Sequence, residues 1–149
     1  SDISKVNHNQ KFDTIRMNWS LEHVHSPSRY FKFFSKHLKD KASKVLICIP
    51  NYDGHIYHID KKNVELPIHL FHFKYKNIYN YCKKYNLKID YFKTFSYATM
   101  YLFSATINKN LIKYGNMSLL EMQKFQKKLS IIDKRNEGND MMFIIRLDK

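Results

Sequence analysis

Residues 44–51 read Lys-Val-Leu-Ile-Cys-Ile-Pro-Asn, an apolar run that ends at a proline and an asparagine. An apolar run without polar alternation is typical of a parallel strand that is covered on both faces. Upstream, Ser26-Pro27 can begin a helix, because serine is a good N-cap and proline suits the first helical position. A further strand is predicted at Phe12–Asn18, so the order strand, helix, strand indicates a βαβ unit.

The same reasoning extends to the carboxyl terminus. A helix is predicted at 74–86, followed by a strand at 87–95 whose apolar residues alternate with polar ones. Ser118-Leu-Leu-Glu121 is a capping box that opens a helix, and residues 141–147 form a final strand. Residues 97–117 are apolar and fit either a helix or a loop, and they are a candidate covering insertion. The whole chain, 1–149, is therefore predicted to be a single α/β domain.

Composition sets limits on the kind of protein. The chain carries 26 Lys+Arg against 13 Asp+Glu, a net charge of +13. Such a charge attracts nucleic acid or an acidic partner, which makes a basic α/β binding module the alternative function. The lysines are scattered, however, and the cluster Lys124, Lys127 and Lys128 has the spacing of a solvated helix face. No signal peptide and no apolar run of transmembrane length is visible, so a cytoplasmic protein without a membrane span is expected.

Four segments carry a resemblance to a known family. Residues 12–27, FDTIRMNWSLEHVHSP, resemble the fourth strand and following loop of class I S-adenosylmethionine-dependent methyltransferases, which often read FD-apolar-N-x-x-LEHV-x-x-P. Residues 45–51, VLICIPN, resemble the fifth strand of that family, and residues 66–73, LPIHLFHF, a segment common in its ubiquinone-biosynthesis-like branch. Residues 138–147, GNDMMFIIRL, resemble the seventh strand, which is antiparallel in the family.

The resemblance implies a partial Rossmann-like sheet, with equivalents of strands four to seven and their flanking helices. The glycine-rich cofactor loop of the family has no counterpart, because the glycines are Gly54, Gly115 and Gly138. The chain therefore resembles only the carboxyl-terminal half of the domain and is expected to be inactive as this fragment. Strand Phe12–Asn18 would have a bare edge, so self-association or pairing with a missing N-terminal segment is expected.

By resemblance, the cofactor is S-adenosylmethionine. Asp2 and Ile3 resemble the segment after the third strand, whose acidic side chain accepts a hydrogen bond from the adenine amino group. Asn18, Trp19 and Ser20 would line the methionine end of the cofactor. The residues alone leave simpler roles open, since Asn18 could be a turn residue and Trp19 a core anchor.

The acceptor is expected to be a small or medium-sized molecule. The carboxyl ends of neighbouring parallel strands meet at one edge of a sheet, so Asn18 and Asn51 should emerge side by side and floor a cleft. His23, Asn51 and Tyr52 are the candidate substrate-binding residues. His23 could instead serve as a polar residue at a helix start.

His69 and His72 are the candidate catalytic residues, because an imidazole can act as a general base toward a hydroxyl or phenol near neutral pH. The alternative is that they cap the helix that begins near Lys74 and pack against neighbouring phenylalanines. His55-x-x-His58, His69-x-x-His72 and His23-x-His25 also suggest metal ligands. No carboxylate or cysteine completes a recognised pattern in the sequence, so no metal is expected.

Overall fold

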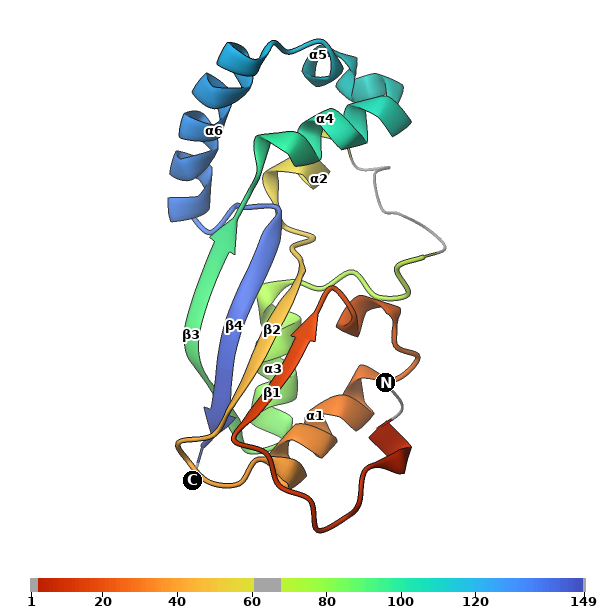
Figure 1. Ribbon diagram of the computed structural model, residues 1–149, viewed down its shortest axis with the longest axis vertical. Coiled ribbons are helices and arrows are strands. Elements are labelled where there is room, and N and C mark those ends of the chain that lie inside the picture. Colours follow the sequence, from red (N-terminus) through yellow and green to blue (C-terminus); the bar gives the residue numbers. More distant parts are fainter. Residues whose placement is uncertain (1–2, 61–67, 149) are drawn as a thin grey trace.

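A computed structural model describes residues 3–60 and 68–148 and shows a sheet with helices on one face and a helical cap at one end (Figure 1). The strands are β1 (Thr14–Asn18), β2 (Lys44–Pro50), β3 (Leu87–Phe95) and β4 (Asp140–Leu147). The helices are α1 (Pro27–His37), α2 (His55–Ile59), α3 (Tyr75–Lys84), α4 (Ala98–Ile107), α5 (Ile112–Gly115) and α6 (Leu119–Lys134). Three 3-10 turns are η1 (Ile3–Lys5), η2 (Leu21–His23) and η3 (Lys109–Leu111).

The described strands lie in the order β1-β2-β4-β3. β1 and β2 are parallel, with Ile15 opposite Val45 and Asn18 opposite Cys48. β4 runs antiparallel to both of its neighbours, β2 and β3. The predicted fold class, a Rossmann-like α/β sheet whose last strand is antiparallel, is therefore confirmed. This arrangement places the carboxyl ends of β1, β2 and β3 at the same edge of the sheet.

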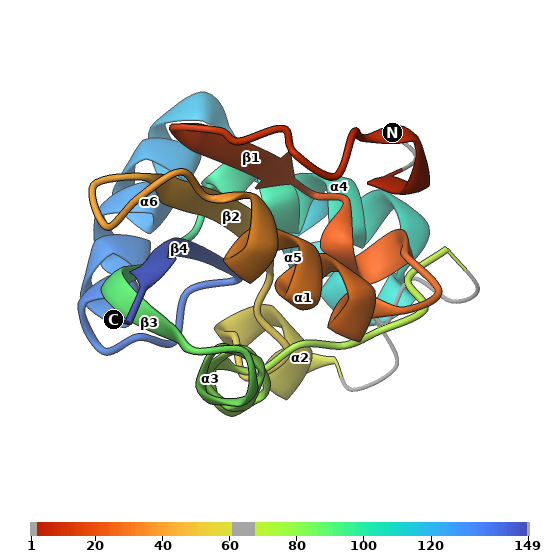
Figure 2. The same cartoon turned by 90° about the horizontal axis from the view of Figure 1, so that it is seen from below.

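The main core lies between the sheet and helices α1 and α3. Val45, Ile47 and Ile49 of β2 are fully buried in this core. Phe31 of α1 stacks on Tyr81 of α3, with ring centroids 4.8 Å apart, so the two helices share one face of the sheet (Figure 2). Pro27 begins α1 as predicted, although the Ser26 side chain makes no capping hydrogen bond.

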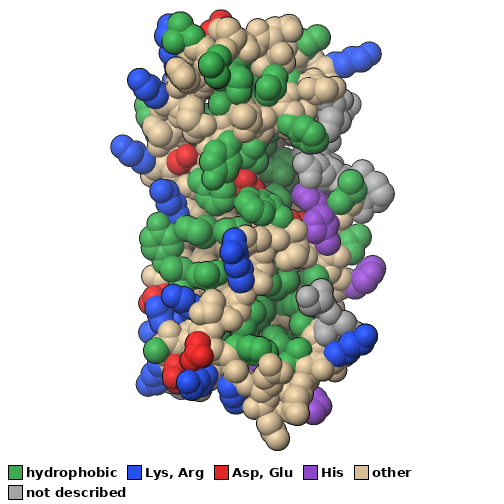
Figure 3. All heavy atoms as spheres, viewed as in Figure 1, with side chains coloured by type: hydrophobic (Ala, Val, Ile, Leu, Met, Phe, Trp, Pro, Cys, Tyr) green, Lys and Arg blue, Asp and Glu red, His purple; other side chains and the backbone are tan. Residues whose placement is uncertain are grey.

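The opposite face of the sheet is less buried than the sequence predicts. Leu46 and Cys48 of β2, which alternate with the buried residues, are only half-buried. Figure 3 shows hydrophobic side chains along this face of the strands. The prediction that residues 44–49 are covered on both faces is thus wrong for the described residues, because α1 and α3 lie on the same side. An unbroken apolar run does not reveal which of its two faces is covered.

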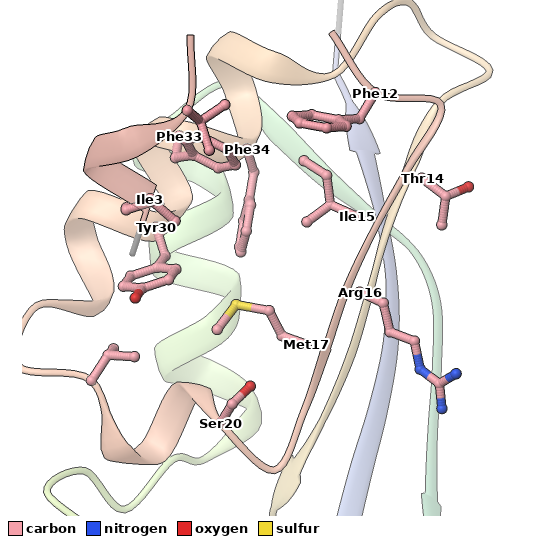
Figure 4. Close-up of a pocket in the computed structure, with 12 residues that line it drawn as sticks. Ile3, Phe12, Thr14, Ile15, Arg16, Met17, Ser20, Tyr30, Phe33 and Phe34 are labelled. Carbon is pink, nitrogen blue, oxygen red and sulfur yellow. The ribbon is translucent and has the colours of Figure 1, made fainter. Parts of the chain in front are cut away.

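The outer edge of β1 borders an apolar groove, called here the β1 groove, which has a volume of about 460 Å³ (Figure 4). It is lined by residues of η1, β1 and α1, including Ile3, Ile15, Met17, Tyr30 and Phe33. Among the described strands, only β2 pairs with β1. The bare edge expected from the resemblance is therefore present in the described part of the chain.

Helices α4 to α6 and α2 form the helical cap, which has a core of its own. Tyr101, Leu111 and Leu129 are fully buried there. The predicted capping box at the start of α6 is present, since the Glu121 carboxylate accepts a hydrogen bond of 2.8 Å from the Ser118 backbone N–H. Within the described residues, no helix has the length and apolar character needed to cross a bilayer.

The contact between α2 and α4 within the helical cap predicts a pH-dependent stability. His55 Nδ1 and the Tyr101 hydroxyl lie 2.7 Å apart, and burial lowers the pKa of His55 below its usual value of 6.5. The unfolded chain then binds a proton more readily than the folded chain, so stability should fall as the pH drops below about 6.5. Urea unfolding at neutral and mildly acidic pH measures this. His55→Gln should flatten the dependence, and an equal slope in both proteins would contradict the assignment.

Candidate active site

A cleft of about 280 Å³ lies between the carboxyl end of the sheet and helix α4. One side of it is lined by residues that follow β1, among them Trp19 and Glu22, and by Pro50 at the end of β2. Met100 and Ser104 of α4 line another side, and Asn139 and Asp140 at the start of β4 complete it. In the layered sheet this is the edge where loops gather and ligands bind in open α/β folds.

Trp19 adopts an unusual backbone conformation directly after β1. Its φ of 41° lies in the left-handed region, which is costly for a bulky side chain. Its backbone N–H continues the sheet by donating to the Cys48 carbonyl at 2.8 Å. Its indole Nε1 donates to Asp140 Oδ1 at 3.1 Å, while 48% of the residue stays exposed. Trp19 therefore ties the end of β1 to the start of β4 and presents an aromatic face beside the cleft.

Two distant segments meet next to Trp19. The Glu22 carbonyl accepts hydrogen bonds from the backbone N–H groups of Leu70 and Phe71, at 2.9 and 3.1 Å. His23 Nδ1 donates to the Ile68 carbonyl at 2.8 Å. These bonds join η2 to the segment that follows β2 and α2, and they bring His69 against Glu22 and His23.

Glu22, His23 and His69 form the cluster that we call the Glu-His-His cluster. One ligand atom from each residue lies within 4.8 Å of the others. Glu22 is 1% exposed and His69 is 6% exposed, whereas His23 is on the surface. His23 Nε2 lies 3.8 Å from Glu22 Oε1, and the two histidine rings are 4.8 Å apart in an edge arrangement. A buried carboxylate needs positive charge or hydrogen bonds nearby, and the imidazoles are placed to supply them.

The structure separates the two candidate catalytic histidines. His69 lines the cleft, whereas His72 lies against Tyr52, with ring centroids 5.0 Å apart. Tyr52 in turn lies near Tyr57, at 5.3 Å. The residue at the N-cap of α3 is Lys74, whose backbone N–H donates to Asn77 Oδ1 at 2.8 Å.

Asn51 directly follows β2, but it is not among the residues that line the cleft. Its Nδ2 donates to the Gly138 carbonyl at 2.8 Å, and its Oδ1 accepts from the Asp53 backbone N–H at 3.2 Å. The Nδ2 group therefore ties the end of β2 to the residues before β4, and the Oδ1 group stabilises the turn that follows β2. Asn18, the last residue of β1, is half-buried.

The candidate cofactor-binding residues lie on two sides of β1. Ile3 and Ser20 both line the β1 groove, so the structure brings them together (Figure 4). Trp19 lines the cleft instead. Asp2 lies outside the described residues.

Sequence reasoning missed the contribution of Asn139 and Asp140, which it placed in the segment that resembles the seventh strand and gave no role in the site. Asn139 Oδ1 accepts a hydrogen bond of 2.9 Å from the Ile56 backbone N–H, and Asp140 receives the Trp19 indole. Both residues are buried at the edge of the cleft. Two neighbouring polar residues before an apolar strand were the available signal, but a turn explains that signal equally well.

The sequence of the chain matches a known protein family. Residues 2–91 match the family described as a methyltransferase domain. The chain belongs to this family. The matched residues contain β1, α1, β2, α3 and most of β3, together with the Glu-His-His cluster. A search of curated proteins gave no significant match.

Solved structures support the same fold at low sequence identity. A protein described as a sarcosine dimethylglycine methyltransferase from Galdieria sulphuraria has a TM-score of 0.58 at 14% identity, over 98% of this chain and 57% of that chain. An S-adenosylmethionine-dependent methyltransferase from Clostridium acetobutylicum has a TM-score of 0.56 at 15% identity, over 100% and 63% of the two chains. One from Mesorhizobium loti has a TM-score of 0.59 at 10% identity, over 98% and 67%. The methyltransferase chain described here thus spans roughly three fifths of the first two relatives.

Proposed function

We propose that this methyltransferase chain forms the acceptor-binding, carboxyl-terminal part of a domain that transfers a methyl group from S-adenosylmethionine to a small or medium-sized acceptor. The observation that carries the proposal is the convergence of Trp19, Glu22, His23 and His69 at the cleft beyond the parallel strands. The family match and the sheet order support it. From the resemblance of residues 66–73, we further propose that the protein belongs to the ubiquinone-biosynthesis-like branch.

The donor is proposed to lie along the carboxyl end of β1. Ile3 and Ser20 would contact it from the β1 groove, which is apolar enough to receive an adenosine ring system. Trp19 and Asn18 follow directly and would approach the methionine end. Asp2 retains its proposed role toward the adenine amino group. The sulfonium methyl would then point toward the cleft, on the other side of Trp19.

The proposed reaction is a nucleophilic displacement at the methyl carbon of the donor. The lone pair of the acceptor forms the new bond to the methyl carbon while the carbon–sulfur bond breaks and its electrons return to sulfur. The donor leaves as a neutral thioether, and the acceptor must lose a proton when a hydroxyl or phenol reacts. Because the donor is intrinsically reactive, the protein mainly orients the acceptor and helps remove that proton. We assign this activation to His69, with His72 and Tyr52 farther out along the acceptor entrance and His23 beside the acceptor.

The helical cap is proposed to cover the acceptor. Residues 97–117 contain α4, which contributes Met100 and Ser104 to the wall of the cleft. A covering element of this kind excludes water from the reacting atoms. Asn51 supports the site from below by joining β2 to the start of β4, rather than by contacting the acceptor through its amide.

The chain is further proposed to need an N-terminal segment, supplied in the same protein or by a partner, at the free edge of β1. An unpaired edge beside an apolar groove is a template for pairing. Alone, the chain is expected to associate with itself and to be inactive, because the glycine-rich grip of the family is absent from residues 1–149. Sedimentation of the chain by itself tests the association, and a dilute, stable monomer would contradict it.

Calorimetric titration with S-adenosylmethionine tests the function. The full-length protein should bind the donor with a Kd in the micromolar range, whereas residues 1–149 alone should bind at least about 100-fold more weakly, which corresponds to about 2.7 kcal/mol. The physical reason is that the glycine-rich loop, with which the family holds the cofactor, has no counterpart in residues 1–149. The proposal fails if the full-length protein does not bind the donor and instead binds nucleic acid with an affinity that falls steeply with salt.

A further inference from the structure

The Glu-His-His cluster suggests a chemistry beyond donor and acceptor binding. We propose that Glu22, His23 and His69 together bind a divalent transition-metal ion, with Zn²⁺ as the type case, at the edge of the cleft. No metal was expected from the sequence, because no carboxylate or cysteine completes a recognised metal-binding pattern with the histidine pairs. The binding of the ion stands apart from the proposed function. Only its role in methyl transfer rests on that function.

The donor set is suitable for such an ion. Two imidazoles and one carboxylate are a known ligand combination for catalytic zinc and for other divalent transition metals. The three ligand atoms lie within 4.8 Å of one another, and His23 Nε2 and Glu22 Oε1 are 3.8 Å apart. Ligand atoms on a tetrahedral ion with bonds of about 2.1 Å lie about 3.4 Å apart. Small side-chain rotations therefore suffice to close the cluster around an ion.

The hydrogen bonds of His23 prepare its other nitrogen to bind a metal. A carbonyl oxygen only accepts, so the Nδ1 that lies 2.8 Å from the Ile68 carbonyl must carry the proton. In the neutral ring, Nε2 then has its lone pair free to coordinate, and it is directed toward Glu22. A ligating histidine that donates its second N–H to a backbone carbonyl is the usual outer-shell arrangement of metal sites.

The backbone holds the ligands in place. His23 and His69 are far apart in the sequence, but the Glu22 carbonyl binds the N–H groups of Leu70 and Phe71 on the residues after His69. Glu22 and His69 are almost completely buried, which limits their rotation. A cluster fixed in this way loses little side-chain entropy when it binds an ion.

An ion pair between Glu22 and a protonated His23 is the competing explanation. At 3.8 Å, the two atoms are too far apart for a good hydrogen bond, which needs a donor–acceptor distance of 2.7 to 3.2 Å. The distance is close to that between two ligands of one ion.

The position of the cluster indicates what the ion would do. Three protein ligands leave at least one coordination position open, and Glu22, His23 and His69 all line the cleft. An acceptor with an oxygen donor, such as a phenol or another hydroxyl compound, could occupy that position. A bound ion lowers the pKa of a coordinated hydroxyl, so the acceptor would lose its proton to solvent and attack the methyl carbon as an oxyanion. His69 would then activate the acceptor as a ligand of the ion rather than as the base itself.

Titration of chelator-treated, tag-free protein with Zn²⁺ or Co²⁺ tests the site. The wild-type protein should bind one equivalent with at least micromolar affinity, and Co²⁺ should give the visible absorption of a low-coordinate site. His23→Gln is the main variant, because this residue is on the surface and its loss should not disturb the core. It should weaken Zn²⁺ binding at least about tenfold. His69→Ala should do the same if it folds, as judged by circular dichroism.

His25→Ala is the matched control, since this exposed histidine lies two residues from His23 and outside the cluster. It should leave the affinity unchanged. The proposal is overturned if wild type binds no ion, or if His25→Ala weakens binding as much as His23→Gln does. If metal binds but the full-length protein shows no methyl transfer, the metal site stands and the proposed function fails. If the metal-free protein transfers methyl groups at the full rate, the role of the ion fails and the function stands.

Discussion

Replacing His69 with alanine in the full-length protein is expected to lower kcat at least about 100-fold while changing the Kd for S-adenosylmethionine less than twofold. Removal of a group that helps take a proton from the acceptor typically costs a factor of 10² to 10⁴. His69 lies in the cleft beside Glu22 and His23, away from the β1 groove where the donor is proposed to lie. A loss confined to turnover would therefore place this residue on the acceptor side.

His72→Ala is the matched comparison for this experiment. His72 comes from the same segment but lies against Tyr52 rather than in the Glu-His-His cluster. We expect a loss of less than about tenfold, because removal of an outer contact affects binding more than chemistry. Single-turnover kinetics with both variants separates the steps. An unchanged kcat for His69→Ala would show that His69 has no part in the mechanism. Equal losses of kcat for both variants would argue against a special role of the Glu-His-His cluster.

Gly138→Ala is expected to destabilise the protein by about 3 kcal/mol, the upper part of the range for overpacked positions. A Cβ at this position would lie 2.6 Å from the Phe95 backbone nitrogen and 2.7 Å from Asp133 Oδ1. The backbone atom at the end of β3 cannot move aside without breaking the sheet. The Gly138 carbonyl also accepts the Asn51 side-chain bond, so the change would disturb the floor of the cleft.

Gly115→Ala is the control, because its added Cβ would meet only the Ala105 Cβ at 3.5 Å, an ordinary contact. Alanine in this helical position should be neutral or stabilising by up to about 1 kcal/mol. Urea unfolding of both variants gives the two free energies. A Gly138→Ala protein as stable as Gly115→Ala would show that the junction of β3 and β4 can open without cost.

The elements that were predicted well are those whose sequence pattern is local. The strand 87–95 has the predicted bounds, and α6 begins at its capping box as expected. The strand pattern of 44–49 was recognised, but the prediction that both of its faces are covered was wrong for the described residues. Which face a helix covers depends on the chain path between strands, and no local pattern encodes that path.

The candidate site shows the same division. The motif LEHV after the first strand indicated where functional residues would lie, and His23 and His69 were named from their residue type. Their meeting at Glu22 could not be seen, because it depends on hydrogen bonds between η2 and residues 68–71. For Asn51, the position after β2 was predicted from the sequence. The hydrogen bond of its side-chain amide to the Gly138 carbonyl was not.

The sequence by itself determined the order of the four strands and of helices α1, α3 and α6, because hydrophobic periodicity, caps and breakers act over a few neighbouring residues. Tertiary structure decided which side chains share a cavity, since a buried carboxylate and two imidazoles from separate loops come together only after the sheet has aligned its strand ends. The position of Trp19 against Asp140 has the same origin, because its left-handed backbone is maintained by contacts with β2 and β4.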